Sequence, residues 1–282
     1  SIPFSLIYVT LVLGNSVILF IIKTDPNLYE PMYVFLSMLA NTDLCLLIST
    51  MTTTMGIFWF NSREISHDAC FAQLFFIHSL SCIESALVLS MAFDRSVAIC
   101  NPLRYDSFLT LPRIAKMGLV SLLRGVALIF PLPILLKQYR YSQANILSHS
   151  YCLNPEVMTM VCSDIRVNII YGFFMTVYSV GLDLLLILLS YVMILKTVLS
   201  ITSHVERLKA LNTCVSDACV VLLSYMPAIG FSVIYRFVKY SSPLLQNVLG
   251  DVSFLVPLLM NPIVYSVKTK PIRVRIIRVS IK

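Results

Sequence analysis

Several ionisable side chains fall inside long apolar stretches of this sequence, where no water would solvate a charge. They are Asp43, His78, Glu84, Asp94, Asp183, Asp217 and Asp251. A charge at the centre of a bilayer costs about 3 kcal/mol or more, so each group needs a partner or a function. Any one of them alone could be a polar contact between two helices. Six acids together exceed that explanation, and Asp43 and Glu84 could share a proton or a small cation such as sodium.

The elements that must position these groups are seven apolar stretches. Hydrophobic residues make up 58% of the 282 residues and charged residues only 12%, whereas a soluble domain carries about 25% charged residues. This composition excludes a soluble enzyme and a disordered chain. A helix of about 20 apolar residues crosses a bilayer, and the stretches are Ile2–Ile22, Pro31–Phe58, Cys70–Ile99, Ile114–Leu136, Asn168–Leu195, Ala210–Phe237 and Pro243–Val267. We predict an all-α membrane protein with a single seven-transmembrane helix bundle over residues 1–282, including a short cytoplasmic segment at 268–282.

The distribution of basic residues predicts the orientation of this bundle. Fourteen of the 21 Lys and Arg residues lie in the loops and tail on one side of the stretches, and six lie on the other. The remaining one, Arg124, lies inside the fourth stretch. Because cytoplasmic loops collect Lys and Arg, we expect an extracellular N-terminus and a cytoplasmic C-terminus. The sequence begins at Ser1 without a methionine, and we expect a trimmed or unusual N-terminus.

Polar residues in the outer half of the predicted bundle suggest a ligand site. Arg236 follows Pro227 by nine residues, about 13 Å along a helix. His78 precedes Asp94 by sixteen residues, about 24 Å, which places it at a similar outer depth. Spacings of four, three and four residues put these side chains on one helical face: Tyr225, Ile229, Ser232 and Arg236. A guanidinium in an apolar pocket is a natural carboxylate anchor. Arg236 could equally face lipid headgroups, and His78 could be a hydrogen-bonded core histidine.

Other classes of function find little support. The eight cysteines form no C-x-x-C pair, and neither H-E-x-x-H nor G-x-S-x-G occurs. We therefore expect no enzyme, no cofactor, no transition-metal site and no nucleic-acid partner. A seven-span ion or proton transporter using the intramembrane acids stays as an alternative. It would predict repeat symmetry or broken helices, and the sequence has no internal repeat and no lysine in the seventh stretch to hold retinal.

Five motifs, each on the expected stretch, resemble a known family. Asp94-Arg95 lies in MAFDRSVAICNPLRY, NPIVY ends the seventh stretch, and Gly14-Asn15 and Asp43 lie in the first two. This set resembles the rhodopsin-like G-protein-coupled receptors. The longer segments PMYVFLSMLANTDL, SHSYCL, KALNTCVSDAC and NPIVYSVKTK resemble vertebrate olfactory receptors. LKALNTCVS, IYGFF, NPLRY and Arg236 are similar to the class I, fish-like branch.

The resemblance implies an odorant receptor of the plasma membrane, in the cilia of olfactory neurons. It would bind a carboxylic acid or another small polar aliphatic odorant and activate a stimulatory G protein to raise cAMP. The residues expected at the ligand are His78, Ser81, Cys82, Ser85, Ile229, Ser232, Arg236 and Asp251. The resemblance also implies a Cys70–Cys152 disulfide that pins an extracellular loop over the pocket.

The same resemblance implies a switch at the cytoplasmic end. Arg95, held by Asp94, would reach toward the space between the third, fifth and sixth helices once released. The switch residues are Asp94, Arg95, Tyr191, Asp217, Asn261, Pro262 and Tyr265, and the polar network behind them is Asn15, Asp43 and Glu84.

Four departures from the family pattern leave room for a signalling-impaired, pseudogene-like receptor. Ser96 stands where D-R-Y has tyrosine, and Ser142 stands where relatives have a cysteine that would pair with Cys162. Asp251, ten residues before Asn261, is at expected pocket depth and could neutralise Arg236. The fourth, Asp217, replaces the histidine of KAxxTCxSH.

We predict that Asp217→His raises basal and ligand-stimulated cAMP. Asp217 lies in the cytoplasmic half of the sixth stretch, where an ion pair with Arg95 would hold the receptor inactive. Cells expressing equal surface amounts of the two proteins provide the measurement. Unchanged basal and stimulated cAMP would show that no such restraint exists.

Overall fold

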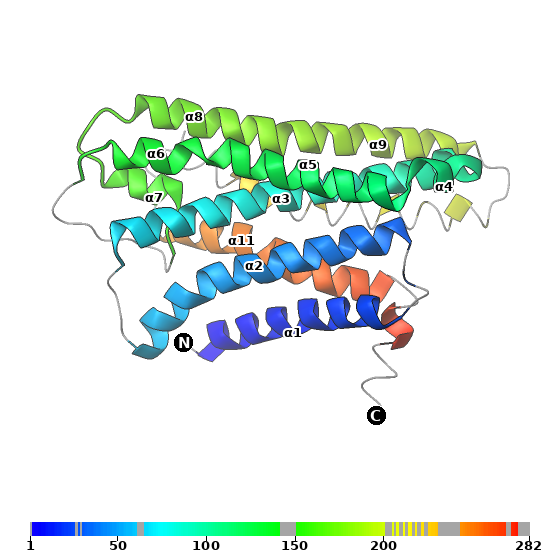
Figure 1. Ribbon diagram of the computed structural model, residues 1–282, viewed down its shortest axis with the longest axis horizontal. Helices are drawn as coiled ribbons and strands as arrows, with labels where there is room; N and C mark the ends of the chain where they lie inside the picture. The colour runs from blue at the N-terminus through cyan, green and yellow to red at the C-terminus, as the bar shows by residue number, and fades with distance from the viewer. Residues whose placement is uncertain are drawn as a thin grey trace.

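The computed structural model is a bundle of long helices that lie roughly side by side (Figure 1). It describes residues 2–25, 28, 30–60, 65–141, 151–200, 243–268 and 272–275, together with 205, 207, 208, 211, 214, 215, 218, 221, 222 and 225–230. The first helices are α1 (Ile2–Thr24), α2 (Pro31–Phe60) and α3 (His67–Cys100). They are followed by a 3₁₀ turn (Pro102–Arg104), α4 (Tyr105–Phe108), α5 (Leu111–Ile129), α6 (Pro131–Lys137) and α7 (Asn154–Thr159). The last elements are α8 (Arg166–Thr176), a π-helical turn (Val177–Gly181), α9 (Leu182–Leu199) and α11 (Pro243–Lys268).

Five of the described helical segments have the length and composition to cross a membrane. They are Ser5–Thr24, Pro31–Ile57, His67–Cys100, Leu111–Lys137 and Arg166–Leu199. α11 adds 26 residues, with a shorter apolar part at Phe254–Val264. Within the sixth predicted stretch the structure describes a helical segment at 225–230.

Local chemistry explains where the long helices are interrupted. Pro131 and Pro133 stand at the start of α6, where a proline nitrogen cannot donate to the preceding turn, so α5 and α6 meet at a break. Pro257 and Pro262 remove two backbone donors inside α11. Between α8 and α9 the helix widens into the π turn at Val177–Gly181, a form that is frequent at functional sites.

α3 lies at the centre of the bundle, against α2, α5 and α9. Its contact with α5 depends on glycine, because a Cβ atom at Gly125 would lie 2.6 Å from Cγ1 of Ile83 and 2.9 Å from the carbonyl oxygen of Ser79. Small residues let membrane helices approach this closely. The close approach brings the next-door residue, Arg124, within reach of the bundle interior.

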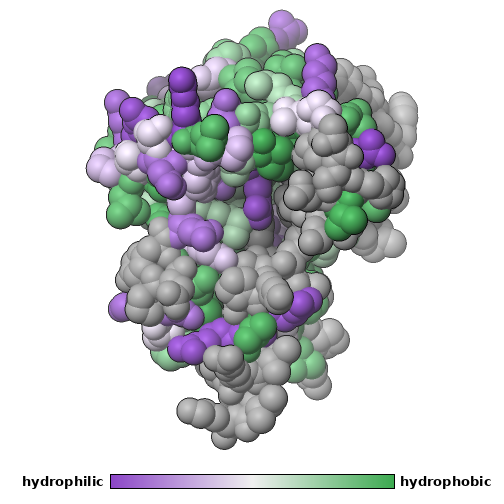
Figure 2. Space-filling view, turned by 90° about the vertical axis from the view of Figure 1, so that its right-hand side faces the viewer, coloured by the Kyte–Doolittle hydropathy of each residue, from purple (hydrophilic) through white to green (hydrophobic). Residues whose placement is uncertain are grey.

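The surface is apolar along the bundle and charged at one end. Leu122, Phe174 and Leu185 are about half exposed on α5, α8 and α9, as lipid-facing residues should be. Exposed cations gather where α1, the 3₁₀ turn and α9 end, among them Lys23, Arg104 and Lys196. Figure 2 looks onto this end, on the right in Figure 1, and shows hydrophilic side chains over much of its described surface.

Candidate functional site

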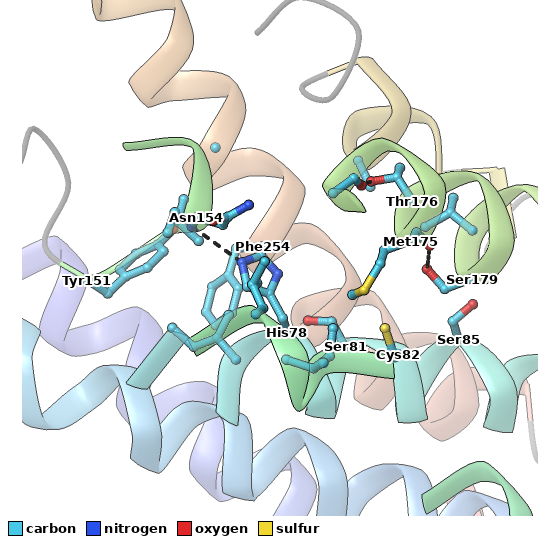
Figure 3. Close-up of a pocket in the computed structure, with 18 residues that line it drawn as sticks. His78, Ser81, Cys82, Ser85, Tyr151, Asn154, Met175, Thr176, Ser179 and Phe254 are labelled. Atoms are coloured by element: carbon cyan, nitrogen blue, oxygen red, sulfur yellow. Dashed lines mark hydrogen bonds between the residues drawn. The ribbon is translucent and has the colours of Figure 1, made fainter. Parts of the chain in front are cut away.

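A cavity of about 230 Å³ opens between α3, the α5–α6 break, α7, α8 and α11. Four predicted ligand residues, His78, Ser81, Cys82 and Ser85, line it from α3 (Figure 3). Their spacing of three, one and three residues puts them on one face of the helix. The other walls are mostly apolar and come from Ile77, Ile129, Leu132, Tyr151, Leu153, Asn154, Gly172, Met175, Thr176, Ser179, Val180, Ala228, Gly250 and Phe254. The cavity thus combines a few polar groups with apolar walls, the usual make-up of a small-molecule site.

Of the other four predicted ligand residues, one does not line the cavity and three lie wholly or partly outside the described residues. Ile229 packs beside Tyr225 in an apolar cluster and is not among the cavity-lining residues. Ser232 and Arg236 lie outside the described residues. Asp251 belongs to α11, but its side chain lies outside the description, and its neighbour Gly250 lines the cavity. The carboxylate anchor at Arg236 therefore stays a prediction.

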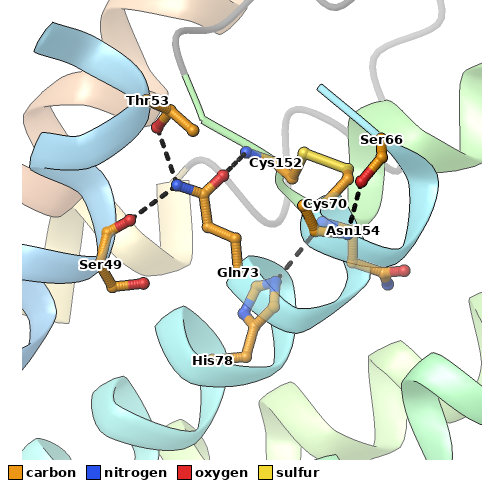
Figure 4. Close-up of a disulfide and its surroundings, with 9 residues drawn as sticks. Ser49, Thr53, Ser66, Cys70, Gln73, His78, Cys152 and Asn154 are labelled. Atoms are coloured by element: carbon orange, nitrogen blue, oxygen red, sulfur yellow. Dashed lines mark hydrogen bonds between the residues drawn. A yellow bond between two sulfur atoms is a disulfide. The ribbon is translucent and has the colours of Figure 1, made fainter. Parts of the chain in front are cut away.

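The roof of the cavity is a loop held by a disulfide. The predicted Cys70–Cys152 bond is confirmed, with 5.5 Å between the Cα atoms. Gln73, one turn along α3, holds the same loop by a second link (Figure 4). Its amide nitrogen donates to the carbonyl of Ser49 and the hydroxyl of Thr53, both at 2.8 Å, and its oxygen accepts from the Cys152 N–H at 3.0 Å. Sequence reasoning missed Gln73, because no motif marks an uncharged amide.

His78 joins the roof to the cavity wall. Its Nε2 atom accepts from the backbone N–H of Asn154 at 3.5 Å (Figure 3). This bond assigns the proton of the neutral ring to Nδ1. His78 is therefore both a hydrogen-bonded interior histidine and a cavity-lining residue, so the two sequence interpretations describe the same side chain.

The floor of the cavity is a buried polar network around Asp183. The Asp183 carboxylate is fully buried and pairs with Nη1 of Arg124 at 2.7 Å through one oxygen. The hydroxyl of Ser85 donates to the other oxygen at 2.7 Å. Since that hydroxyl has a single proton, the Tyr225 hydroxyl, 2.7 Å away, donates to Ser85 Oγ. The second Arg124 nitrogen, Nη2, donates to the Tyr178 carbonyl at 3.2 Å.

This network ties α3, α5, the π turn, α9 and the segment 225–230 together. Arg124 lies inside the fourth predicted stretch, and no role was predicted for it. A buried partner for Arg124 could have been predicted, because an arginine within an apolar stretch needs an acid nearby. Asp183 is such an acid. The sequence positions do not show which of the six intramembrane acids pairs with Arg124.

A second buried cluster lies deeper in the bundle. The side-chain nitrogen of Asn261 donates to Asp43 at 3.2 Å and to Glu84 at 3.1 Å, so the structure brings together one group each from α2, α3 and α11. Asp43 Oδ1 has no hydrogen-bond partner among the described residues. Asn15 is buried in α1 and donates to the Leu11 carbonyl at 3.2 Å.

Pro262 lies against α1, where a Cβ atom at Gly14 would be 3.3 Å from the proline Cβ. The backbone of Tyr265 belongs to α11, but its side chain lies outside the described residues.

At the charged end Asp94 accepts a hydrogen bond from the Tyr105 hydroxyl at 2.8 Å. Burial raises the pKa of Tyr105, and the Asp94 carboxylate raises this pKa further. Nη2 of Arg95 lies 2.7 Å from the Met32 sulfur. Tyr191 is buried in α9 beside Ala92 of α3, and Asp217 lies outside the described residues. Tyr105 is thus a partner of Asp94 that sequence analysis did not name.

A ligand-sized cavity near one end of a membrane bundle, with the adjacent residues Asp94 and Arg95 at the charged end, is the arrangement of a G-protein-coupled receptor. A family model described as "Olfactory receptor" matches residues 4–282. The chain is 60% identical to human Olfactory receptor 51G2 over 276 residues, which is 98% of this chain and 88% of the relative. It is 56% identical to human Olfactory receptor 51G1 (99% and 87%) and 50% identical to human Olfactory receptor 51E1 (98% and 86%).

The chain belongs to the olfactory receptor family, class I, with relatives in the 51 family. It is a non-enzymatic, multi-pass membrane receptor of the seven-transmembrane type. The predictions of fold class and family are confirmed. The family implies an odorant ligand and coupling to a G protein.

We predict that Arg124→Leu destabilises the bundle by about 3–5 kcal/mol, because it leaves the buried Asp183 charge without its partner. The double variant Arg124→Leu/Asp183→Leu should recover most of the loss. The measurement is thermal unfolding of the detergent-purified protein.

Lys137→Ala is the matched control for this prediction. It breaks the 2.8 Å pair between Lys137 and Asp68, whose side chains are 61% and 83% exposed. Such a solvent-exposed pair adds little to stability, because water and salt screen it. Equal losses for Arg124→Leu and Lys137→Ala would contradict the assigned importance of the buried pair.

Proposed function

We propose that this receptor detects small polar aliphatic odorants, carboxylic acids among them, in the outer half of its bundle, and activates a stimulatory, olfactory-type G protein to raise cAMP. The observation that carries the proposal is the cavity itself. Its polar groups on α3 face apolar walls, and its innermost polar residue, Ser85, is hydrogen bonded to Tyr225 on the sixth stretch.

The cavity offers a small ligand two kinds of interaction. Residues such as Ile77, Leu132 and Met175 can bury an alkyl chain, at about 0.8 kcal/mol for each methylene group removed from water. His78 offers a ring N–H donor, and Ser81 a hydroxyl. An acid would in addition meet Arg236, for which helical spacing predicts a similar depth, through a bidentate guanidinium–carboxylate contact.

The floor of the cavity is the route from ligand to helix movement. A ligand that reaches Ser85 changes how that hydroxyl is shared between Asp183 and Tyr225. Because Asp183 is fixed by Arg124, the movable partner is Tyr225. Activation is then a shift in population between two packings of the sixth helix, with the ligand favouring the outward one.

At the cytoplasmic end the outward packing opens the space between the third, fifth and sixth helices, and Arg95 would leave Met32 of α2 to enter it. Tyr105 holds Asp94, and Tyr191 packs beside α3. Release of Arg95 into the opened space, with Tyr191 and Tyr265 at its border, would form the contact surface for the G protein.

Asp43 and Glu84 form part of the same proposal. Two carboxylates around one amide, out of water, cannot both stay bare charges without large cost, and Asp43 Oδ1 has no partner among the described residues. We assign to the pair a shared proton or a sodium ion. Titration of sodium against the ligand response, with Asp43→Asn alongside, separates the two.

We predict that Arg236→Ala raises the concentration of acids needed for half-maximal cAMP by about tenfold or more, since charged hydrogen bonds contribute about 1.5–3 kcal/mol. Responses to alcohols and aldehydes of equal chain length should change little. The measurement uses cells with equal surface amounts of each variant and a panel of short- and medium-chain acids, alcohols and aldehydes.

Arg236→Lys is the control that keeps the charge and loses the bidentate fork; it should fall between wild type and Arg236→Ala. Acid responses that survive Arg236→Ala unchanged would remove the carboxylate anchor. Silence toward the whole panel at normal surface levels would favour the signalling-impaired receptor instead.

A further inference from the structure

Ser107 presents an exposed hydroxyl on α4, at the charged end of the bundle (Figure 1). Its hydroxyl donates to the carbonyl of Arg104, three residues earlier, at 2.8 Å. Arg104 is exposed too, and its side chain makes no hydrogen bond or ion pair with the described residues. An exposed serine with an arginine three residues before it is the pattern that basophilic serine kinases select, because an acidic pocket of the kinase binds the guanidinium.

α4 is short enough to open for a kinase. It spans only Tyr105–Phe108, and its N-terminal flanking residue, Arg104, makes no side-chain capping bond. No residue of α4 is buried, and a single helical turn is marginal without support from packing. The segment can therefore adopt the extended form that a kinase active site binds through local opening, without unfolding of the bundle.

Arg113, near the start of α5, lies against the backbone of the same serine. Its Nη1 atom donates to the carbonyl of Ser107 at 2.9 Å and to that of Phe108 at 3.0 Å. Both bonds use one nitrogen, so Nε and Nη2 have no hydrogen-bond partner among the described residues. A phosphate on Ser107 lengthens that side chain, and its oxygens can accept from Nε and Nη2 as a bidentate pair. Asp106 is exposed on the same turn and opposes the added charge, so the phosphate needs Arg113 to compensate it.

We propose that Ser107 is a phosphorylation site, recognised through Arg104 and held through its phosphate by Arg113. The γ-phosphoryl group of ATP is transferred to Ser107 Oγ. A P–O bond to the serine forms, the bond between the γ-phosphorus and the ADP oxygen breaks, and the serine proton passes to the base of the kinase. ADP leaves. The phosphate carries a charge of about −1.5 to −2 and joins α4 to α5.

Tyr105 connects this turn to the switch residues. Its hydroxyl donates to Asp94, and in the same arrangement Arg95 contacts Met32 of α2. A phosphate held by α5 fixes the turn that carries Tyr105 and so favours this arrangement over the one in which Arg95 has left α2. Phosphorylation therefore lowers the response to ligand. This effect on signalling rests on the proposed function, whereas the modification itself does not.

The modification is tested on the purified, detergent-solubilised receptor with ATP and the catalytic domain of a serine kinase that requires arginine three residues before its serine. Mass spectrometry of the peptide that contains Ser107 measures the phosphate. We expect modification of the wild type, none at this position in Ser107→Ala, and a rate about tenfold lower in Arg104→Gln, since one charged hydrogen bond is lost.

Thr110→Ala is the matched control for modification. Thr110 is also exposed on the connection between α3 and α5, but the residue three positions before it is Ser107 and no arginine. Modification of Ser107 in this variant should proceed at the wild-type rate. Absence of phosphate at Ser107 in the wild type, or equal rates for the wild type and Arg104→Gln, would overturn the site.

The effect on signalling is measured as cAMP in cells with equal surface amounts of each variant. Ser107→Glu stands in for the phosphate, and Ser107→Gln is its neutral control of equal size. Ser107→Glu should raise the ligand concentration for half-maximal cAMP by about fivefold or more, and Ser107→Gln should not. Ser107→Glu/Arg113→Gln should respond as Arg113→Gln does, because the anion has lost its partner.

Equal responses of Ser107→Glu and Ser107→Gln would overturn the role of the phosphate in signalling. A receptor that is silent toward every odorant, yet is modified at Ser107 in a way that depends on Arg104, would contradict the proposed function and support the phosphorylation site.

Discussion

The buried charge of Asp183 constrains the rest of this receptor most strongly. A bare carboxylate inside a membrane bundle would be too costly to retain, and Arg124 and Ser85 are placed to compensate it. Arg124 reaches the acid because Gly125 lets α5 lie close against α3. Ser85 then accepts from Tyr225. One charge thereby fixes how the third, fourth, fifth and sixth transmembrane helices pack together.

The cavity lies between this polar floor and a rigid roof. The roof is closed by the Cys70–Cys152 bond and by Gln73, which contacts both α2 and the loop. In the proposed mechanism a ligand enclosed there acts on the floor and on the sixth helix, because the roof is held in place. The lower cluster of Asp43, Glu84 and Asn261 connects α2 and α3 to α11.

The sequence alone predicted the features that follow from apolar length, from helical spacing or from a family motif. Apolar length predicted the helices, the motifs predicted the family and the Cys70–Cys152 disulfide, and the spacing of His78, Ser81, Cys82 and Ser85 agrees with one cavity-facing side of α3. The pairs Arg124–Asp183 and Tyr105–Asp94 could not be predicted. For each of them the sequence offers several chemically suitable partners, and the packing of helices and loops determines which one is used. Ser232 and Arg236 stay predictions because they lie outside the described residues.

In the proposed mechanism Ser85 and Tyr225 act as one unit between the ligand and the sixth helix. A double-mutant cycle with Ser85→Ala, Tyr225→Phe and Ser85→Ala/Tyr225→Phe tests it most directly, using the concentration for half-maximal cAMP at equal surface levels. If the bond transmits activation, either single change should have most of the effect of the double change, with a coupling energy of about 1 kcal/mol or more. Additive effects of the two single changes would show that Ser85 and Tyr225 act independently and would contradict the account.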